Sequence, residues 1–448
     1  MNDWQQKDAR YNWHPYTQMS TLEDDPPLPI ESADGVKLYD ADGNWYYDTI
    51  ASWWCNVHGH GHPRIREAVQ RQMGKLDHTL FAAVAHEPAA ELGERLVNMT
   101  PAALRRVFYS DDGSTAVEVA LKMSLQSWRN RDREDKELFI CLDPGYHGDT
   151  IGCMSVSGVD LFRRPFGPVM FDSVSVPAPF CYRCPVGEDA DSCEVECLGL
   201  LEEALERHAG QTAGLIMEPL LLAAGGMITY PESYLSGAAQ LARKYGAHFI
   251  LDEVATGFGR TGQMLACRKA GVSPDFLCLS KGITGGTLPL AATLTTRDVF
   301  ESFLGPVGSE KTFYHGHTYT ANPAGCAAAL ASLDLFEEED TLENVSERSA
   351  QLREGTADMQ DLPHVGEVRH VGMMAALELV KDEETRERLP DGHEILRSIY
   401  RAGLERNVIL RPIGNVVYLF PPLCTTEDEL ADMLDRAEGA LQEVLRGT

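Results

Sequence analysis

The chain has 448 residues, and its 44% hydrophobic and 24% charged residues are ordinary for a globular protein. These proportions exclude intrinsic disorder, a collagen-like repeat and a coiled coil for the bulk of the chain. Acidic residues outnumber basic ones by 68 to 39, so the formal net charge is −29. Such a surface repels a nucleic-acid backbone and an anionic membrane, and we expect neither as a partner.

The N-terminal residues, MNDWQQKDARYNWHPYTQM, contain no apolar stretch long enough for a secretory signal. The most apolar window, residues 214–228, carries Glu218 and Pro219, so it predicts a buried strand and loop and not a membrane span. We therefore expect a cytoplasmic protein.

Short apolar strands alternate with helical patterns between residues 105 and 330. The helices are expected where apolar residues recur every three to four positions, at 117–128, 234–245 and 323–336. This alternation predicts an α/β fold with a mostly parallel sheet that helices cover on both faces. The strands are expected at 106–109, 138–142, 213–217, 248–251, 276–279 and 290–294.

The acidic run 337–340 marks an expected domain boundary. Residues 61–336 are predicted to form a large domain around the parallel sheet. In residues 337–448, strands expected at 373–379 and 416–419 mix with helices, which predicts a smaller α+β domain. Residues 1–60 are rich in Trp, Tyr and Pro, and we expect this segment to pack with the small domain.

Four of the eleven cysteines lie close together in the sequence FCYRCPVGEDADSCEVECL. The spacing of Cys181, Cys184, Cys193 and Cys197 is compatible with a four-cysteine zinc site. The alternative is a surface loop with reduced thiols, which we favour because the chain is large enough to fold without a metal. We therefore expect no bound metal.

In a doubly wound sheet, ligands bind beyond the carboxyl ends of the strands, so the residues after each strand are the first candidates for a site. Gly113 and Ser114 follow the first strand and open a helix whose free N–H groups can hold a phosphate. Tyr146 lies in a glycine-flanked loop after the second strand. Asp252 and Lys281 directly follow the fourth and fifth strands.

Lys281 is the most informative of these residues, because a long charged side chain after an apolar strand is costly to bury without a purpose. A lysine there can form a Schiff base with the aldehyde of a cofactor. Asp252 can keep a pyridinium nitrogen protonated, Tyr146 can stack on its ring, and Gly113 with Ser114 can take a phosphate. Together these residues predict a pyridoxal 5'-phosphate (PLP) enzyme, with a buried ion pair of Lys281 and Asp252 as the alternative.

Two further patterns resemble ligand sites. Residues 257–262 match G-x-G-x-x-G, but no helical pattern follows and no acidic residue lies at the required distance, so a dinucleotide site is not favoured. His58, His60 and His62 alternate as in a metal-binding strand. The glycines between them and the following Pro63 favour a loop that leads into a helix.

Three motifs, LDEVATGFGRTG (251–262), LSKGITGG (279–286) and HGHTYTANP (315–323), resemble those of class III PLP-dependent aminotransferases of fold type I. The resemblance covers nearly the whole chain and implies that the large domain binds PLP. Within this class, WHPYTQM (13–19), ASWWCNVHGHGHP (51–63) and LRPIGNVVYLFPP (410–422) are similar to the 7,8-diaminopelargonate synthases. Those enzymes convert 8-amino-7-oxononanoate into 7,8-diaminononanoate in biotin biosynthesis.

The resemblance implies roles for individual residues, with Lys281, Asp252 and Tyr146 as the catalytic ones. The segment 316–318 is implied to reach into the site of a neighbouring subunit, and therefore a homodimer with shared active sites. An aromatic wall that ends in a guanidinium suits a nine-carbon keto acid with a terminal carboxylate. The residues implied to bind PLP are Gly113, Ser114, Tyr146, Asp252, Lys281, His317 and Thr318. The residues implied to bind substrate are Tyr16, Trp53, Trp54, Gly316, Arg411 and, as a second carboxylate partner, Arg260.

Two positions depart from the family pattern and bear on the amino donor. His317 stands where members that use S-adenosylmethionine have proline, and Leu222 stands where glutamine is usual. The spelling HGHTY at 315–319 resembles members that use L-lysine, but S-adenosylmethionine is the commoner donor and is the one that we predict. The alternatives are lysine as donor, another class III ω-aminotransferase, and a thiol- or zinc-binding protein in which the PLP fold is a relic.

Overall fold

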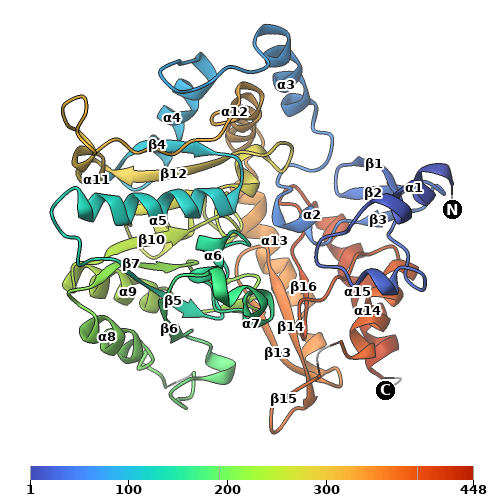
Figure 1. Cartoon of the computed structure of the whole chain (residues 1–448). Coiled ribbons are helices and arrows are strands. Elements are labelled where there is room, and N and C mark those ends of the chain that lie inside the picture. The colour runs from blue at the N-terminus through green and yellow to red at the C-terminus, as the bar shows by residue number, and fades with distance from the viewer. Residues whose placement is uncertain (1, 191, 391, 447–448) are drawn as a thin grey trace.

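The computed structural model describes residues 2–190, 192–390 and 392–446. Its larger part is built on a seven-stranded sheet with the strand order β4-β12-β11-β10-β7-β5-β6 (Figure 1). β12 is antiparallel to both of its neighbours, and the other six strands share one direction. The strands are β4 (Leu104–Ser110), β5 (Leu138–Asp143), β6 (Ser173–Pro177), β7 (Thr212–Met217), β10 (His248–Asp252), β11 (Phe276–Leu279) and β12 (Ala291–Thr296).

Alternate residues of these strands face two separate helical layers, as the two-residue period of a strand requires. Phe139, Ile216 and Ile250 pack in one hydrophobic cluster with the buried face of α5 (Gly113–Arg129). Their neighbours in sequence face the opposite cluster, which contains α4 (Glu87–Met99), α8 (Leu198–Arg207), α9 (Glu232–Lys244) and α12 (Pro323–Glu338). Because both faces are covered, every residue of β7 and β10 is buried. The predicted fold class is confirmed.

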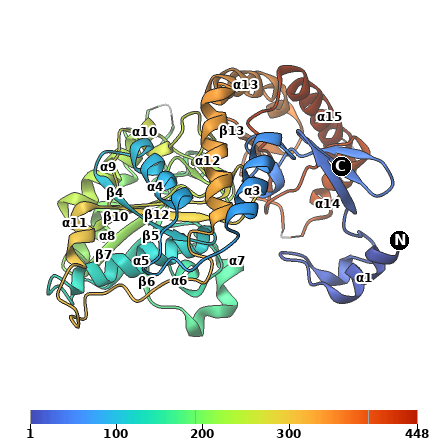
Figure 2. The same ribbon diagram turned by 90° about the horizontal axis from the view of Figure 1, so that it is seen from above.

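The C-terminal part is a four-stranded antiparallel sheet with three helices (Figure 2). β13 (Val365–His370), β14 (Ala375–Asp382), β15 (Glu387–Arg388) and β16 (Val416–Leu419) form the sheet. The helices are α13 (Thr341–Gly355), α14 (Glu394–Glu405) and α15 (Glu427–Leu445).

The N-terminal segment lies beside this C-terminal part (Figure 1). It contains a small antiparallel sheet of β1 (Ile30–Asp34), β2 (Lys37–Asp40) and β3 (Trp45–Tyr47). The backbone N–H of Tyr47 donates to the carbonyl of Asn407 at 2.8 Å, and Val36 and Tyr47 belong to the same hydrophobic cluster as α14 and α15. The domain boundaries at residues 60 and 336 stay predictions.

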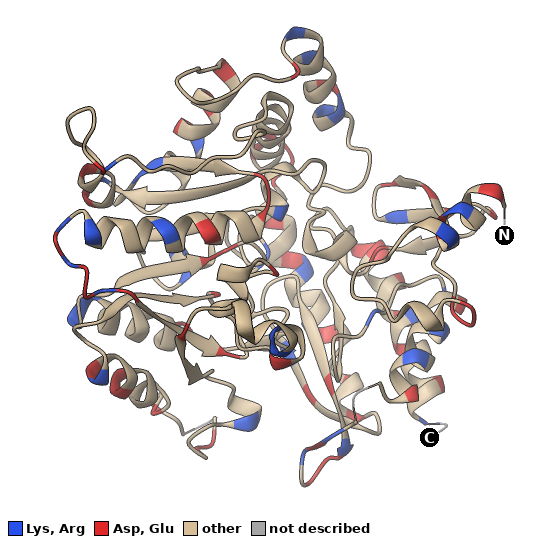
Figure 3. Cartoon of the chain, viewed as in Figure 1, with Lys and Arg blue, Asp and Glu red and all other residues tan. Residues whose placement is uncertain are grey.

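The remaining elements are short or peripheral. Lys, Arg, Asp and Glu lie mainly on helices and turns, with both signs interspersed (Figure 3). Within the described residues, none of the helices has the length and apolar composition needed to cross a membrane.

The remaining helices and strands are α1 (Asp3–Tyr11), α2 (Ala51–Trp54), α3 (Pro63–Lys75), α6 (Ile151–Ser155), α7 (Asp160–Arg163), α10 (Ala266–Lys269), α11 (Arg297–Ser302), β8 (Leu221–Leu222) and β9 (Ile228–Thr229).

Candidate active site

A cavity of about 680 Å³ lies beyond the carboxyl ends of β5, β7, β10 and β11. This is where a doubly wound sheet places its ligands, because loops leave the sheet there in opposite directions. Segments near both ends of the chain complete its wall. Among the residues that line it are nine predicted site residues, namely Tyr16, Trp53, Trp54, Gly113, Ser114, Tyr146, Asp252, Lys281 and Arg411.

Lys281 lies two residues after the end of β11 and lines the cavity. Its Nζ lies 4.7 Å from the ring centroid of Trp54, and burial lowers its pKa, while the negative charges of Asp252 and Glu218 act in the opposite direction. Its φ of 47° is in the left-handed region, which costs free energy at a residue with a β-carbon. An amine with a lowered pKa is a better nucleophile near neutral pH.

Asp252 ends β10, and its carboxylate is almost fully buried, with 4% of the residue exposed. One oxygen, Oδ2, lies 2.8 Å from Nδ1 of His147, and the other accepts the backbone N–H of Val254 at 3.0 Å. The side chain is therefore held by two groups and cannot rotate freely. His147 is itself buried, and its Nε2 has no hydrogen-bond partner.

Tyr146 is fixed through its backbone and its hydroxyl. Its N–H donates to Oε1 of Glu218 at 3.0 Å, and its hydroxyl lies 3.2 Å from that of Tyr16. The Tyr16 hydroxyl in turn donates to the carboxylate of Asp149 at 2.6–2.7 Å. Burial and the Asp149 carboxylate raise the pKa of Tyr16 to about 12, and burial raises that of Tyr146, so both hydroxyls are neutral near pH 7.

The first residues of α5, Gly113 and Ser114, line the cavity together with Asp112, the residue before the helix. Asp112 caps the helix by accepting the N–H of Thr115 at 2.9 Å. A β-carbon at Gly113 would lie 2.5 Å from Cγ1 of Val254, so this helix start approaches the loop after β10 too closely for any side chain. Free N–H groups at a helix start can bind an anion.

The two tryptophans of the cavity wall lie on a left-handed turn. Four consecutive residues, 51–54, have φ between 46° and 73°, which costs about 1–2 kcal/mol at each residue. The buried carboxylate of Asp48 holds the turn by accepting the N–H and the hydroxyl of Ser52 at 2.8 and 2.7 Å. This backbone places both Trp53 and Trp54 at the cavity.

The aromatic wall continues from Trp53 to a guanidinium. Trp53 and Tyr16 are in edge-to-face contact at 5.6 Å between ring centroids, and Tyr16 contacts Phe162 in the same way at 5.1 Å. The guanidinium carbon of Arg411 lies 5.1 Å from the ring centroid of Trp53. One side of the cavity can therefore hold an aliphatic chain, with a cation at the edge for a carboxylate.

Arg260 and the segment 316–318 are not brought to this cavity within one chain. The guanidinium of Arg260 donates to the carbonyls of Met373 and Pro421 at 2.7 and 2.8 Å and lies over the ring of Phe420. Gly316 and Thr318 are exposed, and His317 Nδ1 lies 2.8 Å from Oδ2 of Asp111, a residue at the cavity edge.

The other two sequence patterns have a different local arrangement from the sites that they resemble. Residues 257–262 form turns, and the helix that follows, α10, begins only at Ala266 and has four residues. The histidines at 58, 60 and 62 contact three different partners, namely Ser332, Asp48 and Glu339. Over the described part of the chain, no three His, Cys, Asp or Glu side chains are grouped to hold a metal, and the four cysteines of 181–197 are free thiols.

Sequence reasoning did not assign a role to Glu218, His147 or Phe162, which all line the cavity. Glu218 directly follows β7, so the rule that selected Asp252 and Lys281 could have found it. His147 is adjacent to Tyr146 and could have been found in the same way. Phe162 lies on α7 and follows no strand, and its position depends on tertiary packing alone.

Comparisons with known proteins agree with this geometry. The family model Aminotransferase class-III matches residues 19–441. A protein of Geobacter sulfurreducens named adenosylmethionine-8-amino-7-oxononanoate aminotransferase is 45% identical over 448 residues, which cover 100% of this chain and 98% of that protein. The crystal structure of the enzyme of that name from Methanocaldococcus jannaschii has a TM-score of 0.93 at 41% identity and covers 98% of each chain.

A second solved structure, an amine transaminase from an uncultivated Pseudomonas species in its PLP-bound form, has a TM-score of 0.93 at 36% identity. It covers 97% of this chain and 99% of its own. With a family model that spans nearly the whole chain and relatives above 40% identity over their full length, the chain belongs to the class III aminotransferases.

Proposed function

We propose that this aminotransferase binds PLP and transfers an amino group to 8-amino-7-oxononanoate, giving 7,8-diaminononanoate for biotin synthesis. The observation that carries the proposal is one cavity that holds Lys281 and Asp252 and extends along an aromatic wall to Arg411. The first two residues supply what PLP chemistry needs, and the wall with its cation fits a long keto acid.

The residues of the cavity fit PLP. The N-terminus of α5 offers N–H groups to the phosphate, and Gly113 and Gly148 leave room that a β-carbon would fill, since one at Gly148 would lie 2.1 Å from Oγ of Ser114. Lys281 has its amine in the cavity for the aldehyde, and the buried Asp252 carboxylate suits a protonated pyridine nitrogen. When bound, PLP supplies the electron sink for the reaction.

Each residue then has a distinct task. Lys281 would bind the cofactor, and its Nζ would carry a proton to or from the amine-bearing carbon of the bound substrate in each half-reaction. Asp252, held by His147 and the Val254 N–H, keeps a proton at the ring nitrogen. The Tyr146 and Tyr16 rings and Trp53 exclude water and orient the chain of the substrate, and Arg411 pairs with its carboxylate.

The substrate and the amino donor follow from the relatives. Their names state adenosylmethionine and 8-amino-7-oxononanoate, and we propose both for this chain. L-Lysine is the alternative donor, because of His317 and the HGHTY spelling. A different ω-aminotransferase activity is the alternative function, because neighbours such as the ω-transaminase of Pseudomonas jessenii match with a TM-score of 0.94 at 32% identity.

The test is a turnover assay with purified enzyme and 8-amino-7-oxononanoate, supplied in turn with S-adenosylmethionine, L-lysine and a simple ω-amine. Formation of 7,8-diaminononanoate with S-adenosylmethionine, and little or none with the other donors, is expected. Formation of 7,8-diaminononanoate with lysine alone would mean that lysine is the amino donor. Consumption of the amine with simple aldehydes, without reaction of the nine-carbon keto acid, would mean that the enzyme is a different ω-aminotransferase.

We also propose a cytoplasmic homodimer with shared active sites. Two observations support the dimer: Tyr314, Thr318 and Tyr319 are exposed in one chain, and Gly316 has open space around it. An exposed strip of this kind next to the cavity edge suits contact with a second copy. The eleven free cysteines suit a reducing compartment.

A further inference from the structure

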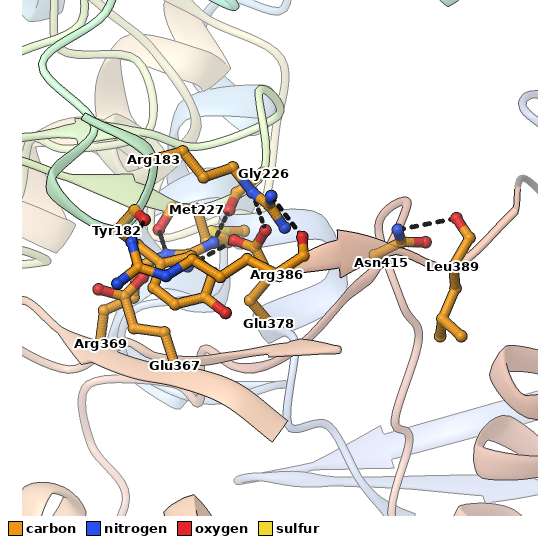
Figure 4. Close-up of polar contacts among 10 residues, drawn as sticks. All are labelled: Tyr182, Arg183, Gly226, Met227, Glu367, Arg369, Glu378, Arg386, Leu389 and Asn415. Atoms are coloured by element: carbon orange, nitrogen blue, oxygen red, sulfur yellow. Dashed lines mark hydrogen bonds and ion pairs between the residues drawn. The ribbon is translucent and has the colours of Figure 1, made fainter. Parts of the chain in front are cut away.

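A buried arginine of the C-terminal part reaches across to a turn of the larger part (Figure 4). Arg369, on β13, is only 5% exposed. Its Nε donates to the carbonyl of Met227 at 2.7 Å, and its Nη2 donates to that of Gly226 at 2.5 Å. Its Nη1 donates to the carboxylates of Glu367 and Glu378 at 2.7 and 2.8 Å. Every nitrogen of this guanidinium is therefore used, in a fork that a lysine could not reproduce.

The carboxylate of Glu378 also joins a second arginine, Arg183, to this network. Glu378 is 3% exposed, and its other oxygen accepts Nε of Arg183 at 2.9 Å. Arg183 also donates to the carbonyl of Arg386 at 2.6 Å. The charge of Arg369 is thus paired inside the protein, and a buried pair of this kind fixes a geometry more than it adds net stability.

The turn that Arg369 holds, residues 223–227, connects β8 to β9 and forms part of the cavity wall through Ala224. Its fit is tight: a β-carbon at Gly225 would lie 1.9 Å from the carbonyl oxygen of Pro144, two residues before Tyr146. At its start, the N–H of Ala223 donates to Oε2 of Glu218 at 3.0 Å.

Glu218 completes the connection to the catalytic residues. Its Oε1 accepts the N–H of Tyr146 at 3.0 Å, while its Oε2 is held by Ala223. The carboxylate is buried and lines the cavity. One of its backbone partners lies in the loop after β5 and the other in the turn 223–227. A continuous set of hydrogen bonds therefore joins Arg369 to Tyr146 through the turn 223–227 and Glu218.

We propose that Arg369 is a positioning residue, which lies outside the cavity and fixes Tyr146 against the cofactor by clamping the turn 223–227. If the clamp is lost, the turn can move away from Pro144, and Glu218 loses one of its two backbone partners, the N–H of Ala223. A displacement of about 1 Å at a ring-facing residue is enough to slow a reaction about 100-fold. The inference rests on the proposed cofactor and does not depend on the identity of the keto acid.

The test is Arg369→Met, with Arg348→Met as the matched control. Arg348 is also a buried arginine of the C-terminal part, 7% exposed, but its partners are Gln351 and Glu347 on its own helix and Glu427 on α15, all in the C-terminal part. We measure thermal unfolding, the visible circular dichroism of bound PLP, and the rate of the donor half-reaction at saturating donor.

Both variants are expected to unfold at a lower temperature. Only Arg369→Met is expected to change the circular dichroism of the cofactor and to lower the saturated rate, by about 10- to 100-fold. An unchanged spectrum and rate in Arg369→Met would overturn the proposal. If that variant does not fold, Arg369→Lys decides by the same criteria, because it keeps a charge beside Glu378 but cannot reach both carbonyls.

A double-mutant cycle tests the route. If Arg369 acts through Glu218, the double variant Arg369→Met/Glu218→Gln should be about as slow as the slower single variant. Independent, multiplicative losses would contradict the relay. A wild-type protein without PLP colour would refute the proposed cofactor instead, so the two failures can be told apart.

Discussion

At the scale of single residues, the proposed chemistry depends on Lys281 and Asp252, which lie at the carboxyl ends of neighbouring strands. Lys281→Ala is expected to abolish turnover without unfolding the protein, because no other lysine lines the cavity formed by the described residues. Lys136→Ala is the control, since Lys136 is also buried but donates to the carbonyls of Thr212 and Gly246 at the opposite end of the sheet. It should lower the unfolding temperature and keep the turnover. Steady turnover by Lys281→Ala would refute the assignment.

Two arginines were predicted to meet the substrate carboxylate, and the structure separates them. Arg411→Ala should slow the half-reaction with the keto acid by about 100-fold, the effect of a few kcal/mol, and spare the half-reaction with the donor. Arg260→Ala should mainly lower stability, because its guanidinium bonds backbone carbonyls away from the cavity. The reverse result in rapid-mixing kinetics would assign the carboxylate to Arg260.

Glu253 makes the stability depend on pH. It is fully buried, caps α10 by accepting the N–H groups of Ala266 and Cys267 at 2.7 Å, and burial raises its pKa to about 7 from an ordinary 4.5. The folded state then binds more protons than the unfolded state between these pH values. Its contribution to the unfolding free energy therefore falls as pH rises from 4.5 to 7, by at most roughly 3 kcal/mol.

Glu253→Gln should accordingly flatten the pH dependence of the unfolding temperature in this window, although it weakens the cap. Glu310→Gln, at an exposed position, is the control and should leave the slope unchanged. If Glu253→Gln and the wild type show the same slope between pH 4.5 and 7, burial does not raise the pKa of Glu253 in the folded protein.

At the scale of elements, the start of α5 packs closely against the loop after β10. Gly113→Ala would force a β-carbon against Val254 and push the helix N-terminus away from the phosphate position. We expect PLP affinity to fall about 10-fold or more, measured by titration of the apoenzyme. Gly74→Ala, in α3 with no neighbour within 4 Å, should leave PLP affinity unchanged. Equal affinities of the Gly113 variant and the wild type would mean that this helix start does not bind the phosphate.

The parts of the fold that depend on local patterns could be predicted from the sequence. The core strands are continuous apolar runs, so β10 and β11 match their predicted ranges within one residue. β6 was missed because it lies at the edge of the sheet and only Val176 is fully buried. The antiparallel direction of β12 could not be read from the sequence, since a strand buried on both faces has the same composition in either direction.

The site residues fall into the same two groups, those that a local sequence pattern predicts and those that depend on tertiary packing. Lys281, Asp252 and Tyr146 could be found because they follow strands in sequence. The left-handed turn at 51–54 could not, because four non-glycine residues adopt it only under the constraint of Asp48 and the surrounding packing. Arg260 lies within one of the family motifs, but the carbonyls that its guanidinium contacts are more than 100 residues away in the chain.

At the scale of the whole molecule, the proposed dimer places parts of one site on two chains. A Lys281→Ala protomer mixed with a Thr318→Trp protomer should recover about a quarter of the wild-type activity, because half of the dimers then own one intact site. Mixing Lys281→Ala with Asp252→Asn is the control and should recover nothing, since both residues line the cavity of one chain. Heterodimers that form without any recovery would contradict shared sites.

The proposed reaction is tested most directly by a single turnover. The enzyme is loaded with pyridoxamine 5'-phosphate, freed of excess cofactor and mixed with 8-amino-7-oxononanoate, and the products are identified by mass spectrometry. Our account predicts about one equivalent of 7,8-diaminononanoate for each active site, together with the return of the PLP absorbance. The proposed reaction would be contradicted if the pyridoxamine phosphate on the enzyme does not react with this keto acid but transfers its amino group to a simple ω-aldehyde.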